Sequence, residues 1–414
     1  MAKREQARLR NSVTDRNAKD LLVHLYACVT LCGGLNCDDA STVAEREFAA
    51  LKMQYPGGPG RATKDLATLL GKQDSLPPLT PDLLGEAFLL TVFAEHGSSV
   101  VARLGALASD RVAATIIRSV QDFSHWGEAA PMHWMEALVA QGEQDWGILL
   151  AIQEALPKDT LALRPLAVAV TQSLLRHVSQ IPELSSERLQ SSLARLWNIL
   201  SVRQGALGQR AEALASIAEA ARMCRALADA NPSAFLPDLA VSLNNLSVRQ
   251  GDMGQRAEAL ASIAEAVDHY RALAAANRDA FLPDLAISLS NQALTQSDMG
   301  QGAEALASAA EAVDRYRALA GSNAEAFLPD LARSLSVLGN CLAALERKLE
   351  ARAAARDALA CLAPFCVRFP GVFDDLARAS VRDYLLHVGR LGEVPAEELL
   401  TPYIHLFETG EPNA

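Results

Sequence analysis

Three cysteines and one histidine near the N-terminus have the types and spacing that could bind zinc. Cys28 and Cys32 lie four residues apart, which places both on one face of a helix, and His24 and Cys37 are close by in the sequence. Structural zinc sites bring four such ligands together. The surrounding run is apolar, however, and a free cysteine in such a run behaves as a small core residue. We therefore predict core packing and no metal site, with zinc as the alternative.

The chain has no other group of residues with the spacing of a known catalytic or cofactor site. The glycine-rich run Gly57–Lys64 lacks the spacing of a phosphate-binding loop and has no strand before it. His125 and His133 flank Pro131, but no acidic partner recurs with them. We predict no catalytic residue and no cofactor. A Cys-His hydrolase stays open as an alternative, because its partners would meet only in space.

A long repeat occupies the second half of the chain. The hexapeptide Phe-Leu-Pro-Asp-Leu-Ala begins at Phe235, Phe281 and Phe327, and each copy starts 46 residues after the last. A fixed period of this kind is typical of an array in which each unit is one helical hairpin. The repeat indicates a surface for binding rather than a pocket for chemistry.

The repeated elements are predicted to be helices. Leu239, Leu243 and Leu246 follow the i, i+4, i+7 pattern of an amphipathic helix. A proline can occupy the first turn of a helix, where its missing N–H costs nothing, and an aspartate beside it favours the positive end of the helix dipole. The hexapeptide prolines are therefore expected to start three helices: Pro237, Pro283 and Pro329.

Small residues keep constant positions in the repeat. In the second unit these are Ser247, Gly254 in the turn, Ala259 and Ala266. The fourth unit has Glu346 at the turn position. This spacing resembles the tetratricopeptide repeat (TPR), a helix-turn-helix of about 34 residues. The surplus length lies after Ala266, so we expect a longer second helix, as in the long-helix repeats of kinesin light chains and many bacterial signalling proteins.

The resemblance covers Pro182 to Pro370 and implies an all-α fold, with an N-terminal helical region followed by an α-solenoid of TPR-like helical hairpins. We predict six divisions: a basic N-terminal segment (1–19), a helical adaptor region (20–157), a helical connector or degenerate repeat (158–190), the TPR-like array (191–370), a degenerate capping hairpin (371–409) and a disordered tail (410–414). In the adaptor region we expect helices at Asp20–Leu31, Ser41–Met53, Ala62–Leu70, Pro81–Ala94, Ser98–Leu107 and Asp110–Phe123.

The resemblance also implies where a partner binds. In the TPR family, side chains of the first helices line a concave groove, and asparagines there hold the backbone of a ligand. The corresponding groove residues here are Arg195, Asn198, Asn244, Asn245, Asn291, Arg333 and Asn340. Carboxamides donate and accept hydrogen bonds at once, so they can hold an extended peptide of any sequence. The alternative is that these asparagines only cap turns or hydrogen-bond the neighbouring helix.

The two arginines lie at the ends of this row, with apolar residues between them. Val241 and Ile287, with Val248 and Leu294, predict a partly apolar groove that accepts a peptide or a helix. The leading prediction is therefore a non-enzymatic scaffold that binds a protein or peptide segment.

The adaptor region carries a second resemblance. Leu22–Leu35 together with Pro81–Leu90 resembles the helical linker that follows the nucleotide-binding module in bacterial multidomain signalling ATPases. The chain lacks the phosphate-binding motif of those proteins. The alternative function is therefore the sensor or regulatory half of such a system, acting with a separate ATPase or effector protein.

Net charge and hydropathy limit the classes of molecule that the protein is expected to bind. The formal net charge of -11 argues against nucleic acid and anionic membranes, since both attract basic surfaces. The longest apolar run, Leu21–Leu35, is shorter than a membrane span. Seven cysteines, an odd number, fit a reducing compartment. We expect a cytoplasmic protein.

Overall fold

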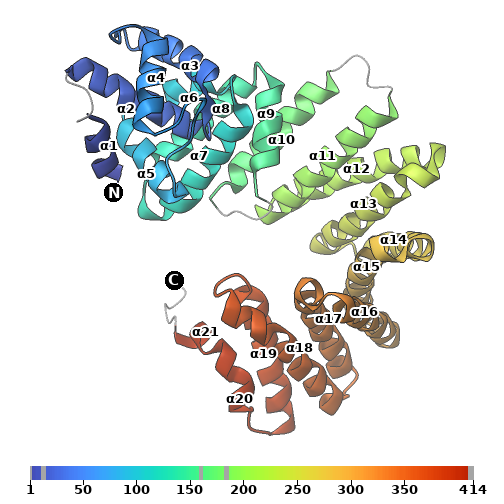
Figure 1. Ribbon diagram of the computed structural model, residues 1–414. Coiled ribbons are helices and arrows are strands. Elements are labelled where there is room, and N and C mark those ends of the chain that lie inside the picture. The colour runs from blue at the N-terminus through green and yellow to red at the C-terminus, as the bar shows by residue number, and fades with distance from the viewer. Residues whose placement is uncertain (1, 11–14, 158–161, 181–185, 409–414) are drawn as a thin grey trace. The chain divides into compact units, whose positions relative to one another are not determined.

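The structure is a computed structural model that describes residues 2–10, 15–157, 162–180 and 186–408. It divides into two compact units, Met1–Leu184 (unit 1) and Ser185–Ala414 (unit 2). Helices account for most of the described chain (Figure 1). The all-α class predicted from the sequence is confirmed. The predicted disordered tail, 410–414, lies outside the described residues.

Ten α-helices occur among the described residues of unit 1. They are α1 (Ala2–Arg10), α2 (Arg16–Leu31), α3 (Cys37–Ala50), α4 (Pro59–Leu69), α5 (Asp82–Val92), α6 (Gly97–Leu104), α7 (Ser109–Phe123), α8 (Ala130–Gly142), α9 (Trp146–Ala155) and α10 (Arg164–Ser179), with a 3-10 turn, η1 (Ser124–Trp126), after α7. The six helices predicted in the adaptor region correspond to α2 through α7.

Helix α2 lies at the centre of unit 1, in contact with α1, α3, α5 and α7. Asp15 caps its start, where the carboxylate accepts the N–H of Ala18 at 2.8 Å. Nearly all of its side chains from Leu21 onwards are buried, which explains why this run is apolar on every face. After α2, Gly33 adopts a left-handed φ of 65° that ends the helix.

Unit 1 also contains two short strands that the sequence did not predict. β1 (Leu35–Asn36) and β2 (Ser75–Leu76) pair antiparallel, with Leu35 opposite Leu76. Two residues are too few to show the alternation by which a strand is recognised in a sequence.

Unit 2 is an α-solenoid of TPR-like helical hairpins, in which each long helix packs on the next. The described helices are α11 (Glu187–Ala206), α12 (Arg210–Ala230), α13 (Pro232–Asp252), α14 (Arg256–Ala276), α15 (Arg278–Asp298), α16 (Gly302–Ser322), α17 (Ala324–Ala344), α18 (Lys348–Arg368), α19 (Asp374–Leu391), α20 (Glu397–Leu400) and α21 (His405–Glu408), with the 3-10 turn η2 (Thr401–Tyr403) between the last two.

Small side chains let the two helices of each hairpin approach closely. On the first helices the buried small residues are Ser201, Ser247, Ala293 and Gly339. On the second helices they are Ala213, Ala259, Ala305 and Ala351. At Gly339 an added Cβ would lie only 3.3 Å from the carbonyl oxygen of Ala351. The sequence landmarks of the repeat are therefore requirements of helix packing.

A left-handed residue forms the turn inside each hairpin. Gly254 has a φ of 74°, and the N–H of Gln255 donates to the carbonyl oxygen of Gln250 at 2.9 Å, closing the end of α13. Gly208 and Gly300 repeat this conformation. In the fourth hairpin Glu346 holds it with a φ of 58°.

Two substitutions at equivalent turns are expected to change stability in opposite directions. Glu346→Gly should raise the free energy of unfolding of unit 2 by about 1 kcal/mol, because it removes the steric cost of a left-handed Cβ. Gly254→Ala should lower it by about 1 kcal/mol for the same reason. Urea unfolding followed by circular dichroism measures both changes, and two changes of the same sign would contradict the turn geometry.

The predicted helix starts at the hexapeptide prolines were wrong. Pro237 lies inside α13, which begins at Pro232, and Pro283 and Pro329 lie inside α15 and α17. An interior proline removes one backbone hydrogen bond. Phe235 and Leu236, just before Pro237, pack against the hairpin core, and this apolar burial offsets the loss.

The second helix is longer, as predicted, since α14 continues past Ala266 to Ala276, but the first helix is long as well. The first and second helices of the second hairpin, α13 and α14, both have 21 residues. The second, third and fourth hairpins each begin directly after an asparagine that ends the previous hairpin. One of these is Asn277, whose side chain accepts the N–H of Ala280 at 3.3 Å. The surplus length is shared, because this cap starts the next first helix early.

The last element of unit 2 is an incomplete hairpin. Helix α19 is followed by α20, η2 and α21 instead of one long second helix. Tyr403 in η2 is fully buried, and its hydroxyl donates to the carbonyl oxygen of Leu359 on α18. Leu406 joins the same core cluster. These short elements cover the apolar face that α18 would otherwise expose.

Candidate protein-binding surface

The first helices of the hairpins form one continuous surface of unit 2, called here the inner surface. Helix α11 contacts α13, α13 contacts α15, α15 contacts α17, and α17 contacts α19. The second helices are connected instead by ion pairs between long side chains. Arg225 pairs with Glu265 at 2.6 Å, and Arg271 pairs with Glu311 at 2.9 Å. Because the first helices are the ones in repeated contact, they lie on the inside of the solenoid.

A ladder of asparagines crosses the inner surface. Asn245 donates to Oδ1 of Asn198 at 2.8 Å and so connects α13 to α11. Asn291 donates to Oδ1 of Asn244 at 3.1 Å and so connects α15 to α13. Asn244 in turn donates to Oδ1 of Asn245 at 3.4 Å. The structure thus brings four of the predicted groove residues together.

In the free protein these asparagines therefore hydrogen-bond the neighbouring helix. The sequence analysis left this role open as the alternative to ligand binding. This hydrogen bonding does not use their whole capacity, since a carboxamide oxygen accepts two hydrogen bonds and its nitrogen donates two. Within the described ranges, no donor reaches Oδ1 of the half-buried Asn291. Whether the ladder also holds a ligand stays a prediction.

The other three predicted groove residues pair with acidic side chains. Arg195 on α11 reaches Asp238 on α13 at 3.2 Å, and Arg333 pairs at 3.3 Å with Asp330 on its own helix. Asn340 donates to Asp383 on α19 at 3.4 Å. All three side chains are exposed. None of the three hydrogen-bonds an asparagine of the ladder in the described chain, although Arg195 lies one helical turn before Asn198 on α11.

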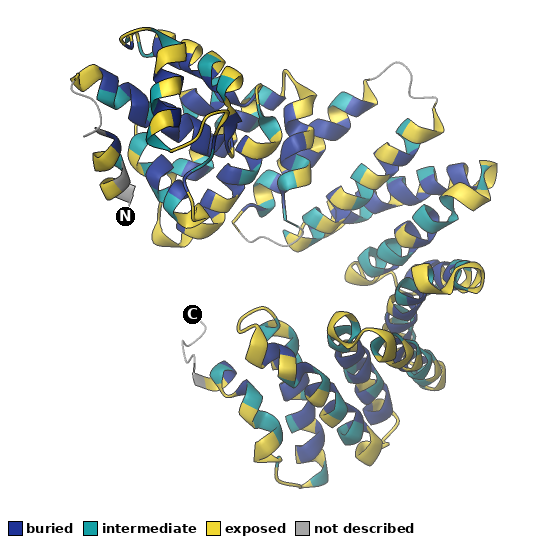
Figure 2. Ribbon diagram, viewed as in Figure 1, coloured by how far each residue is buried: buried dark blue, intermediate teal, exposed yellow. Residues whose placement is uncertain are grey.

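Exposed apolar side chains lie along the inner surface and form what we call the inner stripe. Its members are Ile199, Val202, Val241, Ile287 and Leu294, each between 36% and 47% exposed. Figure 2 shows that exposed and buried residues alternate along the helices of unit 2. Val241 and Ile287 occupy the same repeat position, as do Val202 and Leu294. Repetition makes a stripe out of residues that would otherwise be scattered.

The sequence analysis missed a set of polar pairs inside the hairpins. Each joins a first-helix glutamine to a second-helix serine at 2.7–2.8 Å: Gln204 with Ser216, Gln250 with Ser262, and Gln296 with Ser308. The signal was available, because all six residues follow the 46-residue period. The pairs hold the first helices in place beneath the inner surface.

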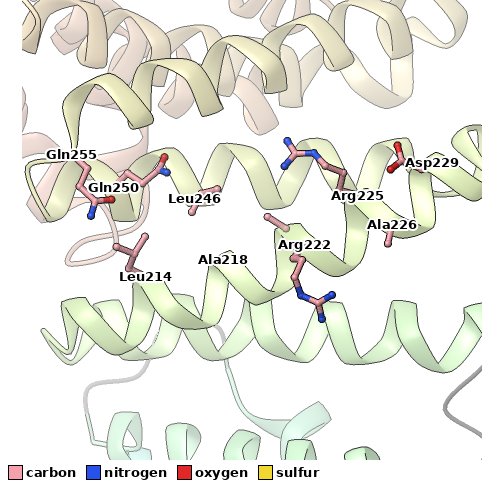
Figure 3. Close-up of a pocket in the computed structure, with 10 residues that line it drawn as sticks. Leu214, Ala218, Arg222, Arg225, Ala226, Asp229, Leu246, Gln250 and Gln255 are labelled. Carbon is pink, nitrogen blue, oxygen red and sulfur yellow. The ribbon is translucent and has the colours of Figure 1, made fainter.

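A shallow hollow lies between α12 and α13 (Figure 3). It arises from small side chains, since Ala221 stands where the next two repeats have Val267 and Val313. The two arginines at its rim are engaged, Arg222 with Glu219 at 2.6 Å and Arg225 with Glu265 at the same distance. Both arginines are therefore already paired, and the remaining charged lining residue, Asp229, is exposed, so we do not take the hollow as the candidate site.

Two of the four residues considered for zinc lie close together in unit 1, and a glutamate joins them. His24, Cys28 and Glu47 lie within 4.8 Å of one another, whereas Cys32 and Cys37 are not part of this group. Both oxygens of the fully buried Glu47 accept hydrogen bonds from Arg103, at 2.6 and 2.8 Å, and His24 reaches it at 2.9 Å. A guanidinium in this position repels a cation, so the group does not fit a metal ion.

The buried thiols do not fit nucleophilic catalysis. Burial, with a smaller effect from Glu47, raises the pKa of the Cys28 thiol well above its usual value, and burial raises that of Cys32 to about 12. A catalytic cysteine needs a lowered pKa, because the thiolate is the nucleophile. Both side chains are buried in the core of unit 1, as the sequence predicted.

Comparisons with known proteins find similarity among solved structures of repeat proteins. No protein-family model matches the chain, and no curated protein matches it. Among solved structures, BtubC (BKLC) from P. vanneervenii is 17% identical, with a TM-score of 0.42, over 62% of this chain and 92% of that one.

A second solved structure is a signal transduction ATPase with numerous domains (STAND) protein with a tetratricopeptide repeat sensor, from Pyrococcus horikoshii. It is 13% identical, with a TM-score of 0.38 over 97% of this chain, and this chain spans 64% of its length. Among the described helices of the present structure, none is long and apolar enough to cross a membrane.

Proposed function

We propose that this protein is a non-enzymatic scaffold that binds a segment of another protein along the inner surface of unit 2. The inner stripe is the observation that carries the proposal, because its five large apolar side chains are partly exposed and four of them occupy equivalent positions in different repeats. Exposed apolar stripes bordered by polar groups are typical of protein-interaction sites.

The polar groups beside the stripe suit a protein ligand. The carboxamide of Asn291 has an oxygen that no donor reaches among the described residues, and the N–H groups of a peptide backbone can supply that donor. Asn244 and Asn245 hold the neighbouring helices at a fixed spacing. A preformed surface of this kind binds with little loss of conformational freedom.

Charge substitutions in the stripe test the proposal. Leu294→Glu should reduce capture of a partner from a cell lysate by about tenfold or more, because a carboxylate cannot pack against apolar side chains without a large desolvation cost. Ala261→Glu, on the exposed face of the second helix α14, is the matched control and should capture the partner normally. Equal capture by all three proteins would refute the inner surface as the binding site.

The alternative function, a sensor or regulatory half acting with a nucleotide-binding partner, is supported by one contact in unit 1. The two segments that resemble the ATPase linker pack together as α2 and α5, where the rings of Tyr26 and Phe88 lie 5.8 Å apart. Adding the purified protein to a candidate ATPase should then change its rate of ATP hydrolysis. No change with a partner that binds it would remove this alternative.

We also propose that the protein works in the cytoplasm. All seven cysteines are free thiols, and five of them are buried. Free buried thiols are typical of proteins in a reducing compartment.

A further inference from the structure

One ion pair on the inner surface defines a repeated position. Arg195 on α11 reaches Asp238 on α13, with Nη2 at 3.2 Å from Oδ2 and 3.4 Å from Oδ1. The two residues are 43 apart in the sequence. The 46-residue period places Val241 and Asp284 at the same two positions in the next pair of hairpins, and Ile287 and Asp330 in the pair after it. The repeat keeps the aspartate and replaces the arginine.

The three aspartates therefore differ in their cations. Asp238 has Arg195, and Asp330 has Arg333 from its own helix at 3.3 Å. Asp284 has Ile287 where Asp330 has Arg333. Across the described chain, no side chain forms an ion pair or a hydrogen bond with the half-buried carboxylate of Asp284. Burial alone raises its pKa, as expected for a carboxylate that has lost water without gaining a cation.

Apolar side chains of the inner stripe border this carboxylate. Val241 on α13 occupies the position from which Arg195 reaches Asp238, and Ile287 follows Asp284 by almost one turn of α15. Their exposed fractions are 38% and 40%. A cation held here would have apolar surface on both sides, and the aliphatic stem of a lysine or arginine packs well on such a surface.

We propose that the inner surface binds a basic amphipathic protein segment, in which a lysine or arginine pairs with Asp284 and apolar side chains on either side pack against Val241 and Ile287. This inference rests on the proposed function and names the chemistry of the partner. The partner's cation takes the place beside Asp284 that Arg195 takes beside Asp238. The net charge of -11 also steers a basic segment toward the protein.

A selection from a random dodecapeptide display library tests this chemistry directly, because the partner need not be identified first. Peptides selected on the wild-type protein should be enriched in lysine or arginine flanked by large apolar residues. Selection on Asp284→Asn should keep the apolar preference and lose the basic one. A wild-type-selected peptide should bind Asp284→Asn about tenfold more weakly, because its cation loses its partner.

A second variant supplies the missing cation from within the protein. Val241→Arg recreates the spacing of Arg195 and Asp238, so its guanidinium should pair with Asp284 and weaken the same peptide about tenfold or more. The matched control is Ala261→Arg, which adds the same charge on the exposed face of α14 and should leave binding unchanged. Circular dichroism confirms that each variant is folded.

The outcomes separate the two proposals. No enrichment on the wild-type protein, or enriched peptides that bind Leu294→Glu as well as the wild type, would overturn the proposed function and this inference with it. Enriched peptides that Leu294→Glu weakens but that show no basic preference, or an unchanged basic preference on Asp284→Asn, would overturn only the inference.

Discussion

Replacing Glu47 by glutamine is expected to destabilise unit 1 by about 3–5 kcal/mol. Glu47 is fully buried and accepts two hydrogen bonds from Arg103 and one from His24, which connects α3 to α6 and α2. A glutamine side chain has only one acceptor oxygen and leaves the guanidinium without a counter-charge. Glu47 is closed to water and the Arg103 side chain is only 31% exposed, so water can replace the lost contacts only in part.

Tryptophan fluorescence measures this effect in unit 1 alone. In a Trp197→Phe background the remaining tryptophans, Trp126, Trp134 and Trp146, all lie in unit 1. Glu45→Gln is the matched control, because it makes the same change two residues away at an exposed position of α3 and should alter stability little. A small loss for Glu47→Gln, similar to that of the control, would contradict the proposed role of the buried ion pair.

The effect of Glu47 should depend on pH in a defined direction. Burial by itself raises the pKa of Glu47, but the hydrogen bonds from Arg103 and His24 outweigh it, so the net pKa is below the usual value. A lowered pKa in the folded state stabilises above the unfolded pKa of about 4.3 and loses that contribution as the pH falls through the folded pKa. The difference between the wild type and Glu47→Gln should therefore shrink below about pH 4.

Glu86→Gln is expected to have the opposite sign, stabilising unit 1 by on the order of 2–3 kcal/mol at pH 8 or above. Burial and the neighbouring Asp122 raise the pKa of Glu86 to about 7, although Arg118 at 3.3 Å opposes the shift. No donor reaches its Oε2 among the described residues. Ionised Glu86 is thus a cost that glutamine, which is always neutral, removes.

The pH profile distinguishes this explanation from a general gain in packing. A raised folded pKa makes wild-type stability fall as the pH rises from about 4.3 to about 7, so the variant and the wild type should be about equally stable near pH 4 and diverge above it. Glu136→Gln, at an exposed position of α8, is the control and should show no such divergence. A gain that is the same at pH 4 and pH 8 would show that ionisation of Glu86 is not its cause.

The repeated half of the fold could be predicted in detail because its constraints are local and recur. A left-handed turn favours glycine, so Gly254 and its equivalents located the hairpin turns in the sequence. The same comparison identified Glu346 as the exception. Close packing selects small residues, so Ser247 and Ala259 fixed which faces of the helices meet. Both constraints act within one hairpin, so the same residue types recur at the same positions of the repeat.

The errors arose where tertiary packing overrides a local preference. Pro237 favours the first turn of a helix, but burial of Phe235 and Leu236 extends α13 by a turn before it. The role of Asp284 was likewise hidden, because its sequence position suggests only a helix-dipole contact. Asp284 is recognised as lacking a cation only by comparison with Asp238, its equivalent in the preceding hairpin, which pairs with Arg195.

The candidate surface could be predicted only in part. The asparagines were located correctly on the first helices, but their hydrogen bonds to one another join residues 47 apart on neighbouring helices, and no sequence pattern fixes such a distance. The Gln250–Ser262 pair was missed because a buried polar pair and an exposed one look alike in a sequence. Periodicity was the signal that could have singled it out.

Site-specific photo-crosslinking in cells tests the central claim most directly. A benzophenone amino acid placed at Leu294 on the inner surface, or at Ala261 on the exposed face of α14, captures whatever protein contacts that position. Binding along the inner surface predicts a discrete crosslinked partner from position 294, mapped by mass spectrometry to one segment, and no such product from position 261. The same partner captured equally from both positions, or only from position 261, would contradict it.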